Sequence, residues 1–232
     1  AAHLVIRALH HHGIRSVSCK FSGGSGFHIG VPFEAFPETV YDKPIREWFP
    51  DGPRAIATYL SELIKPHLLN ELLKDGGIEG VVAKTSIPFQ DLVQRGKFNP
   101  FAVIGIDTLL ISSRHLFRMA YSFNEKTGMV SVPVNPKKVM DFEKAIAVAQ
   151  NVRVSKFTFL DRDKVVGSEA TQLMVQAFDF HQKQSHGQEK KEKKEFEPLE
   201  EAVSEEFFSP CIKKILEGVV DGRKRCVFIL IN

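Results

Sequence analysis

The stretch FSGGSGFHIGVP, residues Phe21 to Pro32, decides how this chain begins to fold. Its three glycines and two serines separate SVSCKF, whose alternation is typical of a strand, from the extended run FHIGV. Glycine adopts the backbone conformations that a tight turn needs. The pattern therefore predicts a β-hairpin with a polar tip that ends at Pro32, and it places His28 just inside the second strand.

A glycine- and serine-rich tip of this kind suggests phosphate binding, because successive backbone N–H groups can surround an anion. Two familiar phosphate motifs are excluded. The loop contains no lysine, as a P-loop would, and the residues after it are extended, whereas the dinucleotide fingerprint needs a helix there. The alternative is a hairpin that contacts no ligand, with His28 as an ordinary partly buried strand residue.

Outward from this hairpin the pattern predicts an α+β fold, with mixed or antiparallel sheets flanked by helices. Helices are expected over residues 2–12, ending at Gly13, over most of 44–75, and from Asn135-Pro136 to about Val148. A short helix or a turn of helix is expected over 112–122. The apolar run 101–106 is expected to be a buried strand, and 129–134 another, after a turn at 126–128.

A second constellation follows the run 101–106. Asp107 ends that expected strand, where a carboxylate is costly unless it meets a metal, a cation or water. In a helix over 112–122, Arg114 and Arg118 would share a face beside His115, and a phosphate between them would relieve their repulsion. Lys126 in the next turn would add to this site. The alternative is a solvated basic helix whose arginines pair with acidic side chains.

Composition bounds the class of protein. The chain has 232 residues, 43% of them hydrophobic, and a net charge of only +3, so bulk charge does not indicate a nucleic-acid binder. Three cysteines do not make a disulfide framework, and no apolar run approaches the roughly 20 residues of a membrane helix. We expect an intracellular protein, without a membrane partner. His10-His11-His12 is interpreted as a solvated helix end rather than a metal site.

Together, FSGGSGFH (Phe21–His28) and IDTLLISSRHLFRMAYSFNEKTGMVSVPV (Ile106–Val134) resemble the small, catalytic subunit of archaeo-eukaryotic DNA primases. The resemblance implies a primase-like catalytic core over residues 1–180, with a helical insert at about 44–97. It also implies primer synthesis on single-stranded DNA from nucleoside triphosphates, and an archaeal-type location in the cytoplasm or nucleoid.

In that family, carboxylates hold two divalent metals, Mg²⁺ or Mn²⁺, against the triphosphate. The resemblance makes Asp107 the catalytic metal ligand, and Ser22, His28 and Arg118 contacts to the nucleotide. The remaining nucleotide-binding candidates lie in the same two blocks: Gly23, Ser25, Arg114, His115, Asn124 and Lys126.

Several positions depart from the family's pattern. Gly24 and Ser25 stand where basic residues are frequent, Asn124 stands near a usual histidine, and Met119-Ala120 replaces a stretch where proline is usual. The family's first acidic pair is absent, since residues 1–21 contain no Asp or Glu. We expect that pair upstream of Ala1 in a longer parent protein, and reduced activity without it.

The last segments carry a charged run and a second resemblance. Residues 181–206 are expected to be a solvated linker, although an exposed helix with Glu/Lys pairs fits the same composition. FFSPCIKKILEGVVDGRKR (Phe207–Arg225) is similar to the start of the iron–sulfur domain of the primase large subunit. This implies Cys211 as a [4Fe–4S] ligand over 207–232, with Cys226 nearby; an amphipathic helix with a buried Cys is the alternative.

Two functions remain open from the sequence. One is a primase-type nucleotidyltransferase, with the primase large subunit, a helicase or other replication proteins as partners. The other is a non-catalytic module that binds nucleotide or template, or assembles replication proteins.

Overall fold

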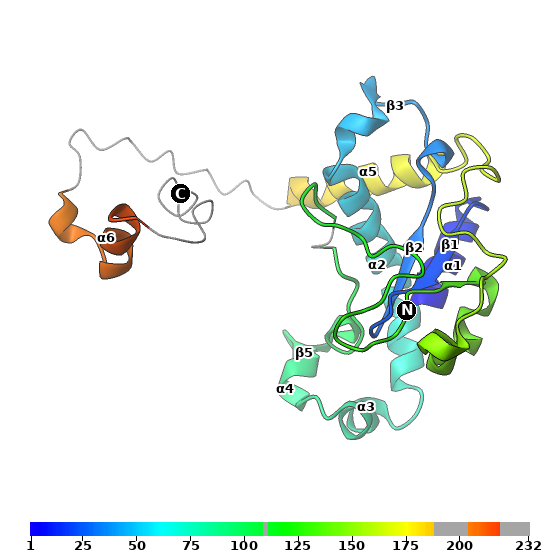
Figure 1. The fold of residues 1–232 in the computed structure, drawn as a ribbon, viewed down its shortest axis with the longest axis horizontal. Helices are drawn as coiled ribbons and strands as arrows, with labels where there is room; N and C mark the ends of the chain where they lie inside the picture. The colour runs from blue at the N-terminus through cyan, green and yellow to red at the C-terminus, as the bar shows by residue number, and fades with distance from the viewer. Residues whose placement is uncertain (109–110, 188–203, 219–232) are drawn as a thin grey trace. The chain divides into compact units, whose positions relative to one another are not determined.

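The computed structural model describes residues 1–108, 111–187 and 204–218. The chain divides into two compact units, 1–189 and 190–232, and each is described by itself. Figure 1 shows the first unit as helices around small antiparallel sheets. This agrees with the expected α+β class.

The predicted hairpin is confirmed. Strand β1 (Ser18–Phe21) pairs antiparallel with β2 (Phe27–Gly30), with Ser18 opposite Gly30 and Phe21 opposite Phe27. The short strand β7 (Pro133–Val134) pairs with the other edge of β1, so β1 lies at the centre of this sheet. The glycine-rich loop is therefore the tip of a hairpin whose first strand is held on both sides.

Helix α1 (Ala2–His11) precedes the hairpin, as predicted. Gly13 ends the helix with a φ of +82°, a conformation that glycine adopts without strain, and its N–H donates to the carbonyl of His10. Leu9 and Ile14 on either side of this turn are both buried. The chain thus passes from α1 into β1, and the apolar face of α1 packs against the core.

The main core forms where α1 meets two longer helices, α2 (Asp51–Leu73) and α5 (Thr171–Gly187). Leu60 and Ile64 of α2 and Leu173 of α5 are buried together with Leu9. A second core cluster packs against the face of the hairpin sheet, with members Phe21, Phe27, Val130, Val132, Phe142 and Ala147. These two clusters fix the hairpin relative to the helices.

The remaining elements are short. The other helices are η1 (Phe33–Ala35), η2 (Ile45–Trp48), α3 (Gly77–Thr85), α4 (Phe89–Leu92), η3 (Pro100–Ala102), η4 (Pro136–Asp141), η5 (Lys144–Ala147) and η6 (Ala149–Asn151). The other strands pair in twos: β3 (Thr39–Val40) with β4 (Lys43–Pro44), and β5 (Val93–Gln94) with β6 (Lys97–Phe98). In the second unit, η7 (Glu205–Phe207) precedes α6 (Pro210–Leu216).

Several predicted elements are wrong. Residues 101–106 are not a strand: η3 covers the first two, and an irregular segment follows. Residues 112–122 contain a turn, in which the His115 N–H donates to the Ser112 carbonyl, but no helix. The helix expected to run to Val148 is instead the 3₁₀ pieces η4 and η5, and 129–134 contributes two isolated bridges before β7. Asn135 does open η4, by accepting a hydrogen bond from the Lys137 N–H.

Two further expectations need correction. His12 is not solvated but 4% exposed, since its Nδ1–H donates to the Ala8 carbonyl at 2.7 Å. Helix α5 continues to Gly187, so the first seven residues of the expected linker are helical, and residues 188–203 lie outside the described part of the chain. Among the described residues, no helix is long and apolar enough to span a membrane.

Candidate anion-binding site

The glycine-rich tip is organised around one serine oxygen. Ser22 Oγ lies within hydrogen-bonding distance of two backbone N–H groups, 3.2 Å from Gly24 N and 3.4 Å from Gly26 N. The Ser22 N–H donates in turn to the Gly26 carbonyl at 2.9 Å. The loop therefore directs two backbone donors at a single acceptor, the Ser22 hydroxyl, and an anion that displaced this hydroxyl would meet the same two donors.

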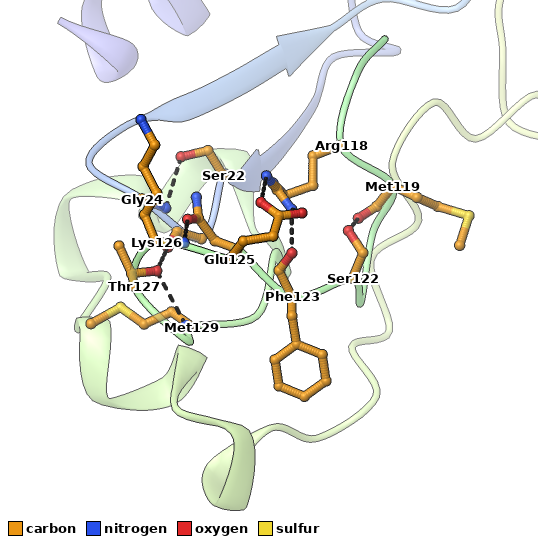
Figure 2. Close-up of polar contacts among 12 residues, drawn as sticks. Ser22, Gly24, Arg118, Met119, Ser122, Phe123, Glu125, Lys126, Thr127 and Met129 are labelled. Atoms are coloured by element: carbon orange, nitrogen blue, oxygen red, sulfur yellow. Dashed lines mark hydrogen bonds and ion pairs between the residues drawn. The ribbon is translucent and has the colours of Figure 1, made fainter.

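The turn at residues 124–128 packs directly on this loop (Figure 2). Gly23 has a φ of +80°, and a Cβ built there would lie 3.0 Å from Asn124 Cβ and 3.1 Å from the Met129 carbonyl oxygen. Thr127 Oγ1 donates to the Gly23 carbonyl. The two sequence blocks on which the resemblance rests are therefore in contact, although about a hundred residues separate them.

Hydrogen bonds within the turn fix its shape. The Gly128 N–H donates to the Asn124 carbonyl at 2.8 Å, and the Asn124 N–H donates to the Met129 carbonyl at 2.8 Å. Asn124 Oδ1 accepts from the Lys126 N–H at 3.1 Å, so this side chain shapes the turn and leaves Lys126 exposed.

A buried lysine lies on the hairpin next to the loop. Lys20 stands opposite His28 in the β1–β2 register and is 1% exposed. Its ammonium group donates to the Arg118 carbonyl and to Ser131 Oγ, the latter at 3.3 Å. Burial, together with the nearby Arg118 charge, lowers the pKa of Lys20 to about 8.

His28 faces the same surroundings. Its Nδ1 atom is buried and has no hydrogen-bond partner among the described residues, while its ring meets Phe117 edge to face at 5.7 Å. Burial lowers the pKa of His28, and the charges of Lys20 and Arg118 lower it further. A buried polar atom without a partner is costly in a folded protein, and this one lies beside two cations.

Arg118 completes the cluster and is held by one carboxylate. Its guanidinium group donates to both carboxylate oxygens of Glu125, at 3.0 and 2.7 Å, and to the Phe123 carbonyl (Figure 2). The Arg118 hydrogen bond lowers the pKa of Glu125 to about 2. Glu125 is 79% exposed and Arg118 only 26%, so the anion of this pair is the member that faces water.

The structure joins six of the predicted site residues by direct contacts. Contacts among the hairpin, the loop and the turn link Ser22, Gly23, His28, Arg118, Asn124 and Lys126. Ser25 is exposed at the tip. Asp107, Arg114 and His115 are exposed in irregular segments, so the helical face expected to join Arg114 with Arg118 does not exist.

Two residues of this cluster were not predicted. Lys20 could have been found from the hairpin register, because a five-residue connection between Phe21 and Phe27 places it opposite His28. Glu125 could not have been predicted as part of the site, because no pattern in the sequence indicates that it pairs with Arg118. Lys20, His28 and Arg118 are called the cationic cluster below.

Metal ligands were sought separately. The described residues contain no group of three or more His, Cys, Asp or Glu side chains that could hold a metal ion. They therefore do not fit a two-metal centre by themselves. Cys211 is exposed at the start of α6, where a hydrogen bond with Ser209 Oγ at 2.9 Å lowers the pKa of its thiol. Cys226 lies outside the described residues.

Comparison with protein-family models, with curated proteins and with solved structures finds no match to this chain.

Proposed function

We propose that this chain binds the triphosphate of a nucleotide at the cationic cluster, as part of a primase-type nucleotidyltransferase that makes short primers on single-stranded DNA. The observation that carries the proposal is the meeting of three features at one place. The glycine-rich tip, the 124–128 turn and the cationic cluster are joined by direct contacts.

The electrostatics of the cluster favour a polyanion. Three basic groups lie close enough for the charges of Lys20 and Arg118 to lower the pKa of His28, and the pKa of Lys20 is also lowered. An anion placed among them would offset this repulsion and accept hydrogen bonds that are charge-assisted. Arg118, which already binds a carboxylate with two nitrogens, has the geometry to bind a phosphate in the same way.

An aromatic side chain beside the cluster supplies a place for the base. Phe117 is 57% exposed and packs edge to face on His28, so more than half of its surface is accessible to a stacking base. Base–aromatic stacking tolerates every base, because each has a π-face. A nucleotide with its phosphates on the cationic cluster and its base on Phe117 would use both features.

The metal part of the proposal concerns Asp107 alone. Primase-type transfer uses Mg²⁺ or Mn²⁺, which prefer carboxylate oxygens and act in pairs on the attacking and leaving oxygens. One carboxylate cannot hold such a pair, and the described residues offer no group of three ligands. We therefore assign binding and orientation of the triphosphate to the described residues, with Asp107 as a proposed ligand in a complete centre.

Calorimetry with a nucleoside triphosphate tests the binding step. Arg118→Glu should abolish binding, because it places a carboxylate where a phosphate would pair with the guanidinium group. Arg7→Glu, at an exposed position of α1, is the control with the same change in net charge. Equal affinities of wild type and Arg118→Glu, or equal losses in both variants, would contradict the assignment.

A non-catalytic nucleotide- or template-binding module, or one that assembles replication proteins, is the second candidate. The lack of any Asp or Glu in residues 1–21, and so of the acidic pair that precedes the glycine-rich loop in the family, motivates it. A primer-synthesis assay on the protein, with Asp107→Ala as the test variant, separates the two. Loss of synthesis in that variant supports the enzyme, whereas normal synthesis removes Asp107 from the metal site.

Partners such as the primase large subunit or a helicase, and a [4Fe–4S] ligand role for Cys211, belong to the proposal of a primase-type enzyme.

A further inference from the structure

A basic groove lies at the start of β1, at the end of the strand away from the glycine-rich tip. One pocket of about 170 Å³ is lined by Arg15, Lys156, Phe157 and Lys164, among others. A second pocket, of about 380 Å³, is lined by His10, Arg15 and Lys137. Because Arg15 lines both, the two pockets adjoin. They are called the basic groove below.

The backbone on both sides of the groove is held in place. The Leu160 N–H donates to Ser18 Oγ at 2.9 Å, which ties the segment after Phe157 to β1. The Val166 N–H donates to Ser16 Oγ at 3.2 Å. Glu169 accepts from the N–H groups of Arg15 and Ser16 at 2.9 and 2.8 Å, so its carboxylate is engaged by backbone donors. The basic side chains therefore project from a fixed frame.

Cations outnumber carboxylates among the residues that line the groove, and the charges of Glu169 and Asp163 act on Arg15 and Lys164 from beside it. Lys164 pairs with Asp161, the carboxylate that lines the first pocket, at 2.8 Å. In the part of the chain that the structure describes, Arg15, Lys137 and Lys156 are exposed and form no ion pair within 4.0 Å. The net charge of the whole chain is only +3, so this concentration of cations is local. Such a local excess attracts phosphate groups.

An aromatic ring lies among these cations. Lys156 Nζ is 5.6 Å from the centroid of the Phe157 ring, and Phe157 itself is half-buried in the wall of the pocket. A track of basic side chains with an interleaved aromatic ring is the arrangement by which proteins bind single-stranded nucleic acid without sequence preference. A concave pocket also suits phosphates that project from a flexible strand better than the flat surface of a membrane.

We propose that the basic groove binds the sugar–phosphate backbone of a single nucleic-acid strand, with Phe157 as a stacking surface for one base. The groove is distinct from the cationic cluster, because Lys20, His28 and Arg118 are not among the residues that line either pocket. Cys19 does line the groove, and in a strand its side chain points to the opposite face from that of Lys20. The proposal rests on the proposed function and deepens it, because it names residues outside the cationic cluster that would hold the single strand.

Fluorescence anisotropy with a labelled single-stranded oligonucleotide, repeated over a range of salt concentrations, tests the groove on the full 232-residue chain. Arg15→Gln/Lys156→Gln should weaken binding and reduce the slope of log affinity against log salt by about 1.4, since each single-strand phosphate contact contributes about 0.7. Phe157→Leu should weaken binding about tenfold and leave that slope unchanged, because stacking releases no counterions.

Lys84→Gln/Lys97→Gln is the matched control, since both lysines are exposed and lie away from the groove. Circular dichroism establishes that each variant is folded. An unchanged salt slope in Arg15→Gln/Lys156→Gln, or an equal reduction in the control pair, would overturn the proposal. Binding to anionic lipid vesicles in place of the oligonucleotide would overturn it as well. Arg118→Glu should keep oligonucleotide binding. An error in the assignment of the triphosphate site therefore shows in the calorimetry of Arg118→Glu, and an error in the assignment of the groove shows in the anisotropy of Arg15→Gln/Lys156→Gln.

Discussion

At the scale of single residues, most of the free-energy cost of burying the cationic cluster falls on Lys20. An ammonium group that is 1% exposed loses its hydration, and its two acceptors, a carbonyl and a hydroxyl, are uncharged. Arg118, whose carbonyl it binds, adds a like charge nearby. A buried lysine of this kind stores an electrostatic cost that an incoming anion would relieve.

The depressed pKa of Lys20 makes stability depend on pH. Its native pKa of about 8 is below the ordinary 10.5, so between these values the unfolded chain binds more protons and stability rises with pH. Relative to Lys20→Met, wild type should gain up to about 1.4 kcal/mol per pH unit in this window. Urea unfolding of both proteins at pH 7.5, 9 and 10 measures this, and parallel pH profiles would show the prediction to be wrong.

Glu125 should act as a competitor for the nucleotide. Its carboxylate occupies both nitrogens of Arg118 that a phosphate would use, and exposed ion pairs contribute about 0.2–1 kcal/mol. Glu125→Gln should therefore bind a nucleoside triphosphate about 1.4- to 5-fold more tightly by calorimetry. Glu62→Gln, which removes the exposed partner of Lys65, is the control and should leave affinity unchanged. Weaker binding by Glu125→Gln would contradict this role.

At the scale of elements, the predictions that the structure confirms are those that depend on residues close together in the sequence. The hairpin and α1 follow from turn residues and periodicity that lie next to each other in the chain. The predictions for the segment 101–122 fail because its apolar residues resemble a strand and a helix locally, yet Leu116, Phe117 and Met119 remain exposed. Apolar pattern alone does not show whether tertiary contacts will cover a segment.

The contact between the loop and the 124–128 turn depends on a glycine at position 23. Gly23→Ala should cost about 2 kcal/mol, since the left-handed backbone costs about 1–2 kcal/mol and the added Cβ meets Asn124 and the Met129 carbonyl. Gly26→Ala is the internal control, because a Cβ there meets nothing within 4 Å. Urea unfolding should separate the two variants; equal stabilities would show that this contact does not hold the site.

At the scale of the whole first unit, a buried polar contact joins three helices. His12 Nε2, after the end of α1, lies 3.0 Å from both Tyr59 Oη of α2 and Gln176 Oε1 of α5. The interpretation of the three histidines as a solvated end could not foresee this, because the partners are 47 and 164 residues away. Long-range contacts of this kind are what the sequence alone does not reveal.

Removing this contact should destabilise the unit. His12→Ala removes the imidazole that packs between Tyr59 and Gln176, which still bond to each other at 3.0 Å, and leaves the Ala8 carbonyl without its side-chain donor. We expect a loss of about 2–3 kcal/mol in the free energy of unfolding. His11→Ala, at the neighbouring exposed position, should change it by less than about 0.5 kcal/mol. Thermal unfolding of the two variants checks this, and similar midpoints would contradict the role given to His12.

The central claim is that the cationic cluster holds the phosphates of a nucleotide, and nitrogen NMR of the His28 imidazole tests it most directly. Burial and the charges of Lys20 and Arg118 lower the pKa of His28 in the free protein. A bound triphosphate should raise that pKa, because a nearby anion favours the charged imidazole, and affinity should increase as pH falls. If His28 titrates identically with and without saturating triphosphate, the anion does not lie at this cluster.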